Sequence, residues 1–272
     1  MDAALHDILT SPRGGPEALF DVGPLTVEPG QARASMPAGS WLRGRGGRLS
    51  TAGTGVLLDD VLGQAVLSRR PAGHWAVTTE LNLDVAAPLP ADGQMLDASA
   101  SPVHVDEAGG LARAEVRDAA GRLLVLGTSW LRFIPGVPDA ALNPPPLTDV
   151  ADRGDCLTDL LRVRFDESGH LELPVRADLG NPRGVLHGGV LLCLAVMSAE
   201  SVVDGGGVDT ASVRITYLRP AIGDLTLTPA VVHRGRSLGL VRVDVRNAAG
   251  ALCTTATVSS RSAVGPGGGG AS

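Results

Sequence analysis

The chain has 272 residues, of which 44% are hydrophobic, and a formal net charge of −6. This length and hydrophobic content allow one large domain or two small ones with a packed core. The acidic balance argues against a nucleic-acid-binding surface. All 23 basic residues are arginine, which excludes catalysis through a lysine Schiff base.

Features that direct a protein to a membrane or to an oxidising compartment are missing from the sequence pattern. The first segment, MDAALHDILTSPRGG, has neither a basic nor an apolar targeting region, so no signal peptide is expected. The longest apolar run, 190–197, is too short to cross a bilayer. The three cysteines form no CxxC pair or Cys/His cluster. We therefore predict a soluble, cytoplasmic protein with no metal framework.

The predicted elements follow the same order twice. In the first half, 1–136, a strand pair ends at Pro37, a Gly-rich loop follows, a helix covers 53–69, and strands include 78–88 and 116–129. A Pro-rich linker covers 137–154. In the second half, 155–263, a short strand ends at Pro174, a helix covers 188–203, and alternating strands cover 213–220, 225–234, 238–247 and 251–260. The Gly-rich segment 264–272 is predicted to be a flexible tail.

Internal similarity supports this division into two halves. VRDAAGRLLVLGTS at 116–129 matches VRNAAGALCTTATV at 245–258, and TTELNLDVAAP at 78–88 matches TASVRITYLRP at 210–220. The corresponding offsets are 129 and 132, and the prolines that end the first strands, Pro37 and Pro174, are 137 apart. One helix on one antiparallel sheet, repeated, is an α+β architecture. Because a single unit buries little apolar surface, we expect the halves to pair about a pseudo-two-fold axis.

The start of the second helix has the layout of an anion or oxyanion site. A polar loop with Asn181 and His187 leads into Gly188 and Gly189, and the helix that follows is apolar until Glu200. The first amides of a helix are unpaired and carry partial positive charge, which suits the polarisation of a carbonyl group. The segment offers no nearby acid or base of its own. The alternative is an ordinary helix start after a glycine turn.

The run N-x5-HGG, ASVRITYLRPA and VVHRGRSLGLVRVDVRNAAG, in this order, resembles the hotdog-fold thioesterases of the PaaI-like type, in the 4-hydroxybenzoyl-CoA thioesterase superfamily. The resemblance covers most of 160–262, and the first half shares it more weakly through LLDDVLGQA and VTTELNLDVAAPLP. It implies two tandem hotdog domains and an acyl-CoA thioesterase that needs neither metal nor cofactor. It also implies a catalytic acid nine residues after the histidine, where this chain has Val196.

Helix geometry offers a solution through the other half of the chain. Nine residues are about two and a half turns and roughly 13 Å, so one helix cannot present both its first amides and its own acid to one carbonyl. The offset of 137 maps Val196 onto Asp59, His187 onto Ser50 and Asn181 onto Gly44. The two halves have therefore lost complementary residues. We predict one composite site per chain and expect the second one to be chemically empty.

The predicted roles follow from this composite site. The Gly188 amide would stabilise the oxyanion, and Asp59 would act as general base or as nucleophile. Asn181 and His187 would orient water or thioester, with Thr78 beside the carboxylate. Asp60 is the alternative acid. The predicted catalytic residues are Asp59, Asn181, His187, Gly188 and Thr78, and the predicted substrate-binding residues are Gly189, Asp60, Arg234 and Arg236, the arginines for phosphate groups of CoA.

Two other functions fit parts of this pattern. A non-catalytic acyl-CoA-binding or regulatory protein is the main alternative, since each half lacks part of the expected set. An enoyl-CoA hydratase is disfavoured because Asp178 and His187 are nine residues apart, farther than such enzymes space this pair. The sequence does not say which acyl group is bound or whether its thiol carrier is CoA or a carrier protein. It also leaves the oligomeric state open, although the fold would allow a homodimer of such chains.

Overall fold

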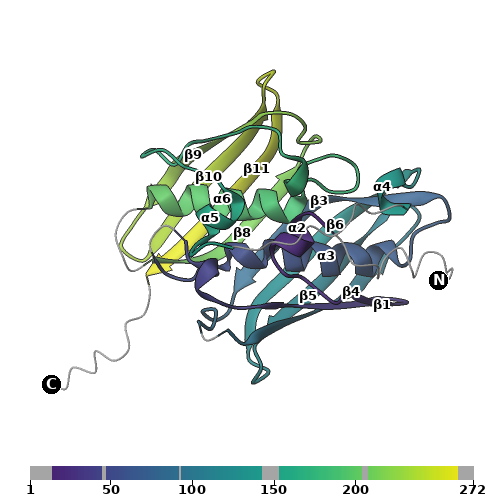
Figure 1. The fold of residues 1–272 in the computed structure, drawn as a ribbon. Helices are drawn as coiled ribbons and strands as arrows, with labels where there is room; N and C mark the ends of the chain where they lie inside the picture. The colour runs from purple at the N-terminus through teal and green to yellow at the C-terminus, as the bar shows by residue number, and fades with distance from the viewer. Residues whose placement is uncertain (1–13, 45–46, 92, 143–152, 204–207, 263–272) are drawn as a thin grey trace.

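The computed structural model describes residues 14–44, 47–91, 93–142, 153–203 and 208–262 (Figure 1). The predicted tail, most of the N-terminal segment MDAALHDILTSPRGG and most of the predicted linker lie outside these residues. Within them, one 11-stranded sheet runs through the molecule in the order β1-β2-β4-β5-β6-β3-β8-β11-β10-β9-β7. The predicted α+β double hotdog is confirmed.

The first half supplies six strands of the sheet and one long helix. The strands are β1 (Thr26–Glu28), β2 (Gln31–Pro37), β3 (His74–Val85), β4 (Met95–Val105), β5 (Gly109–Arg117) and β6 (Leu123–Pro135). The helices are α2 (Pro16–Leu19) and α3 (Thr54–Leu67), and α4 (Asp139–Leu142) follows inside the predicted linker.

The second half repeats this arrangement with five strands. They are β7 (Leu171–Leu173), β8 (Val208–Tyr217), β9 (Leu225–Arg234), β10 (Leu238–Asn247) and β11 (Leu252–Ser262). Its helices are α5 (Leu157–Leu161) and the long α6 (Gly188–Val202). Both predicted long helices are therefore present, each within two residues of its predicted ends.

The halves are joined edge to edge by β3 and β8, which pair antiparallel with Leu83 opposite Val213. Outward from this pair, β6, β5, β4 and β2 on one side mirror β11, β10, β9 and β7 on the other. The strand register also follows the repeat. In β3–β6 Thr78 pairs with Leu131, and at the equivalent place in β8–β11 Thr210 pairs with Ser260. The chain thus contains a pseudo-two-fold axis between β3 and β8.

The long helices α3 and α6 lie side by side on one face of the sheet and contact each other (Figure 1). Both are buried over most of their length because the sheet covers one side and the other helix a second side. Glycines permit the close crossing: a Cβ at Gly189 would lie 2.4 Å from the Gly55 carbonyl oxygen. The crossing brings the start of α6 next to the first two turns of α3, which carry Gly55 and Asp59.

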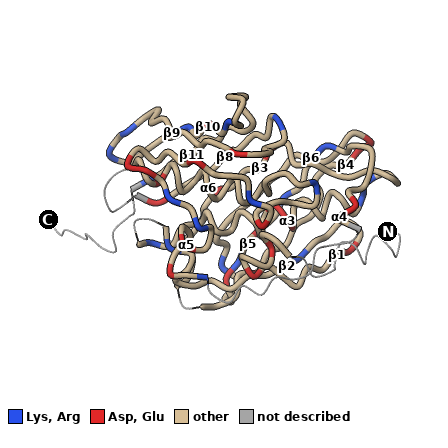
Figure 2. Tube along the Cα trace, turned by 45° about the horizontal axis from the view of Figure 1, so that its top comes forward, with Lys and Arg blue, Asp and Glu red and all other residues tan. Residues whose placement is uncertain are grey.

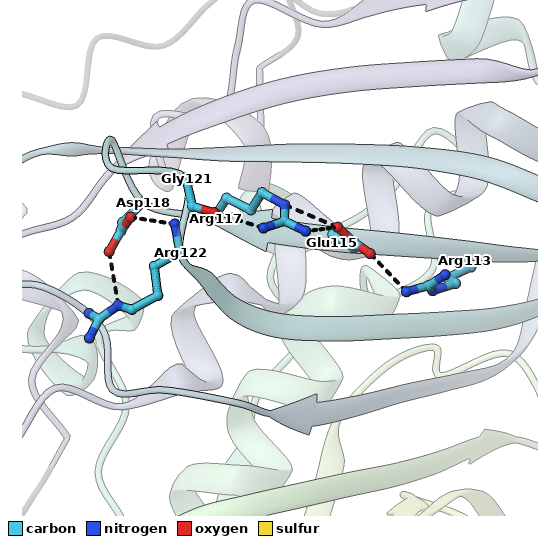
Figure 3. A network of polar contacts seen from close by, with 6 residues as sticks. All are labelled: Arg113, Glu115, Arg117, Asp118, Gly121 and Arg122. Atoms are coloured by element: carbon cyan, nitrogen blue, oxygen red, sulfur yellow. Dashed lines mark hydrogen bonds and ion pairs between the residues drawn. The ribbon is translucent and has the colours of Figure 1, made fainter.

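Charges are scattered over the outside of both halves (Figure 2). One ladder follows the β5–β6 hairpin, where Glu115 accepts hydrogen bonds from Arg113 and Arg117 (Figure 3). At the turn, Asp118 accepts hydrogen bonds from the backbone N–H and the guanidinium of Arg122. The hydrogen bond from the backbone N–H is the main cause that lowers the pKa of Asp118. These pairs hold the hairpin and its turn together. None of the helices in the described ranges could span a membrane.

Candidate active site between the two halves

The loop before α6 is held by its own backbone and by Asn181. Gly180 and Leu186 form an isolated bridge, and Asn181 Oδ1 accepts from the Arg183 amide at 2.9 Å. His187 then caps the helix. The loop before α3 has the same form, with a bridge between Arg43 and Leu49. This matches the predicted offset of 137 and fixes which residues of the two halves are equivalent.

Asp59 of α3 lies directly over the start of α6. Its Oδ2 accepts a hydrogen bond from the Gly189 amide at 2.9 Å, and a Cβ at Gly188 would lie 2.7 Å from the same oxygen. Its Oδ1 accepts from the Thr78 hydroxyl at 3.1 Å. Three residues far apart in the sequence thus meet at one carboxylate.

The Gly188 amide remains available at this point. It occupies the first position of α6, where no intrahelical acceptor exists. No described residue accepts a hydrogen bond from it. Because Gly188 has no side chain, the Asp59 carboxylate can lie close to this first residue of α6. An amide donor and a carboxylate thus lie next to each other at the start of α6.

His187 lies between two carboxylates. Its Nδ1 is 3.4 Å from Asp59 Oδ2 and its Nε2 is 3.5 Å from Asp60 Oδ1, and all three side chains are at least nine-tenths buried. Burial alone would lower the pKa of His187, but the hydrogen bond to Asp60 and the charges of Asp59 and Glu17 raise it to about 9. These acidic neighbours therefore favour the protonated form of His187.

The same contacts act on Asp59. Loss of hydration raises the pKa of Asp59, while His187, Thr78 and the Gly189 amide oppose the rise. The backbone nitrogen of Gly189 also lies 3.1 Å from His187 Nδ1. This ring nitrogen can accept a hydrogen bond from the Gly189 N–H only when the imidazole is neutral. Once His187 is protonated, this amide donates to Asp59 alone.

Two residues of the site were missed by sequence reasoning. The Tyr217 hydroxyl donates to the Gly188 carbonyl oxygen at 2.7 Å and holds the start of α6 from β8. Glu17 of α2 lies beside Asp60 and His187. Tyr217 is the only tyrosine of the chain and lies within the repeat TASVRITYLRP, so the sequence contained a signal that could have marked it as a site residue. Glu17 lies outside the repeat, and nothing in the sequence marked it.

The comparisons with known proteins match both halves of the chain. A family model described as the acyl-CoA thioesterase C-terminal domain matches residues 11–129, and the model described as the acyl-CoA thioesterase N-terminal domain matches residues 176–261. Together the two models match most of the chain. The chain belongs to the tandem hotdog thioesterases. Comparison with curated protein sequences gave no significant match.

Solved structures share the fold of this thioesterase at low sequence identity. The tesB protein of Mycobacterium avium subs paratuberculosis has a TM-score of 0.59 at 13% identity, covering 91% of this chain and 98% of its own. The 12:0-ACP thioesterase from Umbellularia californica has a TM-score of 0.59 at 12% identity, covering 85% and 94%. An acyl-ACP thioesterase from Bacteroides thetaiotaomicron has a TM-score of 0.52 at 11% identity, covering 85% and 98%.

The order of the two matched domains is the reverse of their names. The half that carries Asp59 and Thr78 matches the C-terminal-domain model, yet it comes first in this chain. The half that carries His187 and Gly188 matches the N-terminal-domain model, yet it comes second. Because the site is assembled across a pseudo-two-fold axis, either order can bring the same residues together.

Other predicted residues of the thioesterase are held by contacts with their neighbours. Asn181 Oδ1 accepts hydrogen bonds from the backbone amides of Arg183 and Val185, which belong to the same loop. Gly189 packs against the backbone of Gly55, which closes its Cα to a ligand. Asp178, part of the disfavoured hydratase pattern, is paired with Arg176.

The predicted phosphate-binding arginines lie at the far end of α6. Arg234 donates to the Val202 carbonyl oxygen at 2.6 Å, at the last residue of the helix. Fourteen residues separate Val202 from Gly188, about 21 Å along a helix. Arg236 lies two residues beyond, in the turn between β9 and β10. The structure therefore does not bring these arginines to the Asp59 carboxylate.

The second composite site is not chemically empty, and that prediction was wrong. Val196 is buried, as expected, but Glu200, one helical turn later, reaches the equivalent place. Glu200 Oε1 accepts from the Ser50 hydroxyl at 3.0 Å and from the Thr210 hydroxyl at 2.9 Å. The prediction failed because it required the acid at the same helix position, whereas the longer glutamate compensates for a shift of one turn.

One group of side chains at the first site could ligate a metal ion. The ligand atoms of Glu17, Asp60 and His187 lie within 4.8 Å of one another. The ion pair between His187 and Asp60 accounts for this closeness without an ion. The hydrolytic chemistry described below uses none.

Proposed function

We propose that this thioesterase hydrolyses acyl-CoA at one composite site, with Asp59 as its base and the Gly188 amide as its oxyanion donor. The observation that carries the proposal is the Asp59 carboxylate of one half lying over the first residue of α6 of the other half. The mechanism is that of the PaaI-like resemblance, divided between the two halves of one chain.

The chemistry can be followed atom by atom. The thioester carbonyl oxygen accepts from the Gly188 amide, and Asp59 removes a proton from water as the water oxygen attacks the carbonyl carbon. The tetrahedral intermediate collapses with cleavage of the C–S bond. The thiolate takes up the proton that Asp59 received, which releases the free acid and the thiol. Thr78 holds the carboxylate, and Tyr217 holds the loop at Gly188.

A variant of this route uses Asp59 as the nucleophile. Its oxygen then attacks the carbonyl carbon, the thiolate leaves, and water hydrolyses the resulting anhydride. Single-turnover hydrolysis in oxygen-18 water separates the two routes. Water attack on the thioester leaves Asp59 unlabelled, whereas hydrolysis of an anhydride by attack at the Asp59 carbonyl carbon places the label in the protein.

His187 supplies positive charge to this step. As an imidazolium it favours the ionised form of Asp59, which burial alone would disfavour. Asp60 and Glu17 hold the imidazolium from the other side. His187 and Asp60 are thus positioning residues, and Asp59 is the catalytic residue.

Asp59→Asn is expected to lower kcat/KM by at least about 100-fold, because the amide cannot accept a proton from water. The measurement is free-thiol release from acetyl-, hexanoyl-, palmitoyl-, phenylacetyl- and benzoyl-CoA, with an acyl carrier-protein thioester as a further substrate. Asp60→Asn is expected to have a smaller effect.

Asp97→Asn is the matched control, because Asp97 is exposed on β4, and its activity should equal that of the wild type. Equal activity of Asp59→Asn and Asp97→Asn would contradict the proposed site. Tight acyl-CoA binding without hydrolysis by the wild type would instead indicate a binding or regulatory protein.

Sedimentation of the wild type tests the proposed homodimer, and the proposed cytoplasmic location is tested by fractionation.

A further inference from the structure

Asp59 and Gly63 are the two residues of α3 that are not fully buried. All other residues of this helix are buried. Because Asp59 and Gly63 are four residues apart, they lie on one face of the helix, about 6 Å apart along its axis. The partly exposed strip of α3 therefore extends from the catalytic carboxylate by one turn, to Gly63.

Gly63 stands in the interior of a helix, where glycine is less stable than alanine by about 0.5–1 kcal/mol. Gly55, the other glycine of α3, has a packing reason, because a Cβ there would lie 2.6 Å from the Gly189 carbonyl oxygen. A Cβ at Gly63 would meet no described neighbour within 4 Å. The space in front of Gly63 is thus open, and packing within the described part of the chain does not account for the missing side chain.

The other long helix shows where a side chain at this position points. By the offset of 137 between the helix starts, Gly63 corresponds to Glu200. Glu200 Oε1 accepts a hydrogen bond from the Thr210 hydroxyl of β8 at 2.9 Å. Since Thr210 in β8 is equivalent to Thr78 in β3, the open space at Gly63 faces β3 near Thr78.

The strands beyond Thr78 provide an apolar wall for this space. α3 ends at Leu67 and β3 begins at His74, so the later residues of α3 lie beside the earlier residues of β3. Two residues before Thr78, Ala76 pairs with Phe133, and strand alternation places this pair on the same face as Thr78. Two residues of a strand span about 7 Å, close to one turn of a helix. A ligand that extends along α3 from the catalytic carboxylate would therefore meet apolar side chains.

We propose that Gly63 is a specificity-determining residue, which leaves room for a straight-chain acyl group beyond its first carbons. The thioester carbonyl lies at the start of α6, and the acyl chain extends along α3 over Gly63, against Ala76 and Phe133. An acetyl group ends before this turn of the helix, whereas a hexanoyl group reaches it. The position of the thioester in this proposal rests on the proposed function.

Gly63→Leu tests this role by placing a side chain in the path of the acyl group. The measurement is kcat/KM for acetyl-CoA and for hexanoyl-CoA, by free-thiol release. The ratio of the hexanoyl to the acetyl value should fall by at least about tenfold, because the leucine takes the place of several methylene groups of the substrate. Partial loss of folded protein would lower both values equally and leave the ratio unchanged.

Ala76→Leu narrows the same space from the strand side and should lower the ratio as well. Ala230→Leu is the matched control, because it makes the same exchange at an exposed position of β9, and its ratio should equal that of the wild type. Thermal unfolding verifies that each variant is folded. Where Gly63→Leu does not fold, the ratio in Ala76→Leu decides in the same way.

An unchanged ratio in folded Gly63→Leu overturns the proposed role of Gly63, as does a wild type that hydrolyses acetyl-CoA but not hexanoyl-CoA. Failure of the proposed function is recognised separately, by the absence of thiol release from either substrate with the wild type. Calorimetric binding of hexanoyl-CoA then decides the role of Gly63. Weaker binding by Gly63→Leu than by the wild type supports that role, and equal affinity overturns it.

Discussion

His187 combines structural and chemical roles because three acidic side chains, Asp59, Asp60 and Glu17, lie around it. It precedes the first residue of α6, faces Asp59 through Nδ1, and faces Asp60 through Nε2. A buried charge is tolerated only when it is paired. The three acidic neighbours supply that pairing, and removal of any one of them leaves less compensation for the imidazolium.

This arrangement predicts a pH-dependent stability. The pKa of His187 rises from 6.5 to about 9 in the folded protein. A raised histidine pKa stabilises the fold below the unfolded value, and the contribution is lost as pH rises through the folded value. The contribution is on the order of 3 kcal/mol. Between pH 6 and pH 10 the free energy of unfolding of the wild type should fall more than that of His187→Gln. Parallel curves in urea unfolding would exclude this role.

At the scale of elements, the crossing of α3 and α6 decides where the site forms. Their contact at Gly55 and Gly189 is close enough that neither position accommodates a Cβ. Because helices with larger residues at the crossing would lie farther apart, the distance from Asp59 to the Gly188 backbone depends on these glycines.

Gly189→Ala is expected to destabilise the protein by about 1–3 kcal/mol, because the new methyl group overlaps the Gly55 carbonyl. Gly63→Ala is the matched exchange on α3, where a Cβ meets nothing within 4 Å. It should instead stabilise the protein by about 0.5–1 kcal/mol, since alanine favours a helix interior over glycine. Urea unfolding measures both, and equal effects would contradict the close crossing.

At the scale of the whole molecule, the halves are held together by β3–β8 pairing and by helix contact. These interactions do not depend on which half is synthesised first. The family models, matched in reverse order, describe the same pair of domains.

A chain in which residues 153–262 precede residues 14–142, joined by the original linker sequence, should therefore fold and hydrolyse acyl-CoA. Activity within about tenfold of the wild type is expected, because Asp59 and Gly188 still meet across the same helix pair. Thiol release and circular dichroism provide the measurement. A folded but inactive product would show that chain order affects the site.

Much of the fold followed from patterns in the sequence. Period-two alternation placed strands such as β9 and β10, and the offsets of the repeat predicted both the pseudo-two-fold arrangement and the equivalence of the two helix starts. The meeting of Asp59, Thr78 and Gly188 was predicted from complementary losses in the two halves. Local pattern was sufficient here because the repeat carries the symmetry that brings distant residues together.

Other features were decided only by tertiary packing. Glu17 reaches the site from α2, outside any motif, and Tyr217 reaches it from β8, where the repeat gave its position but not its contact with Gly188. Glu200 fills the place predicted to be empty because a longer side chain, one turn later, reaches the same hydroxyl groups. Sequence spacing specifies positions along a helix. Which side-chain atoms meet depends on side-chain length, on the distance between helices and on what neighbouring strands leave unfilled, and these quantities exist only in the folded protein.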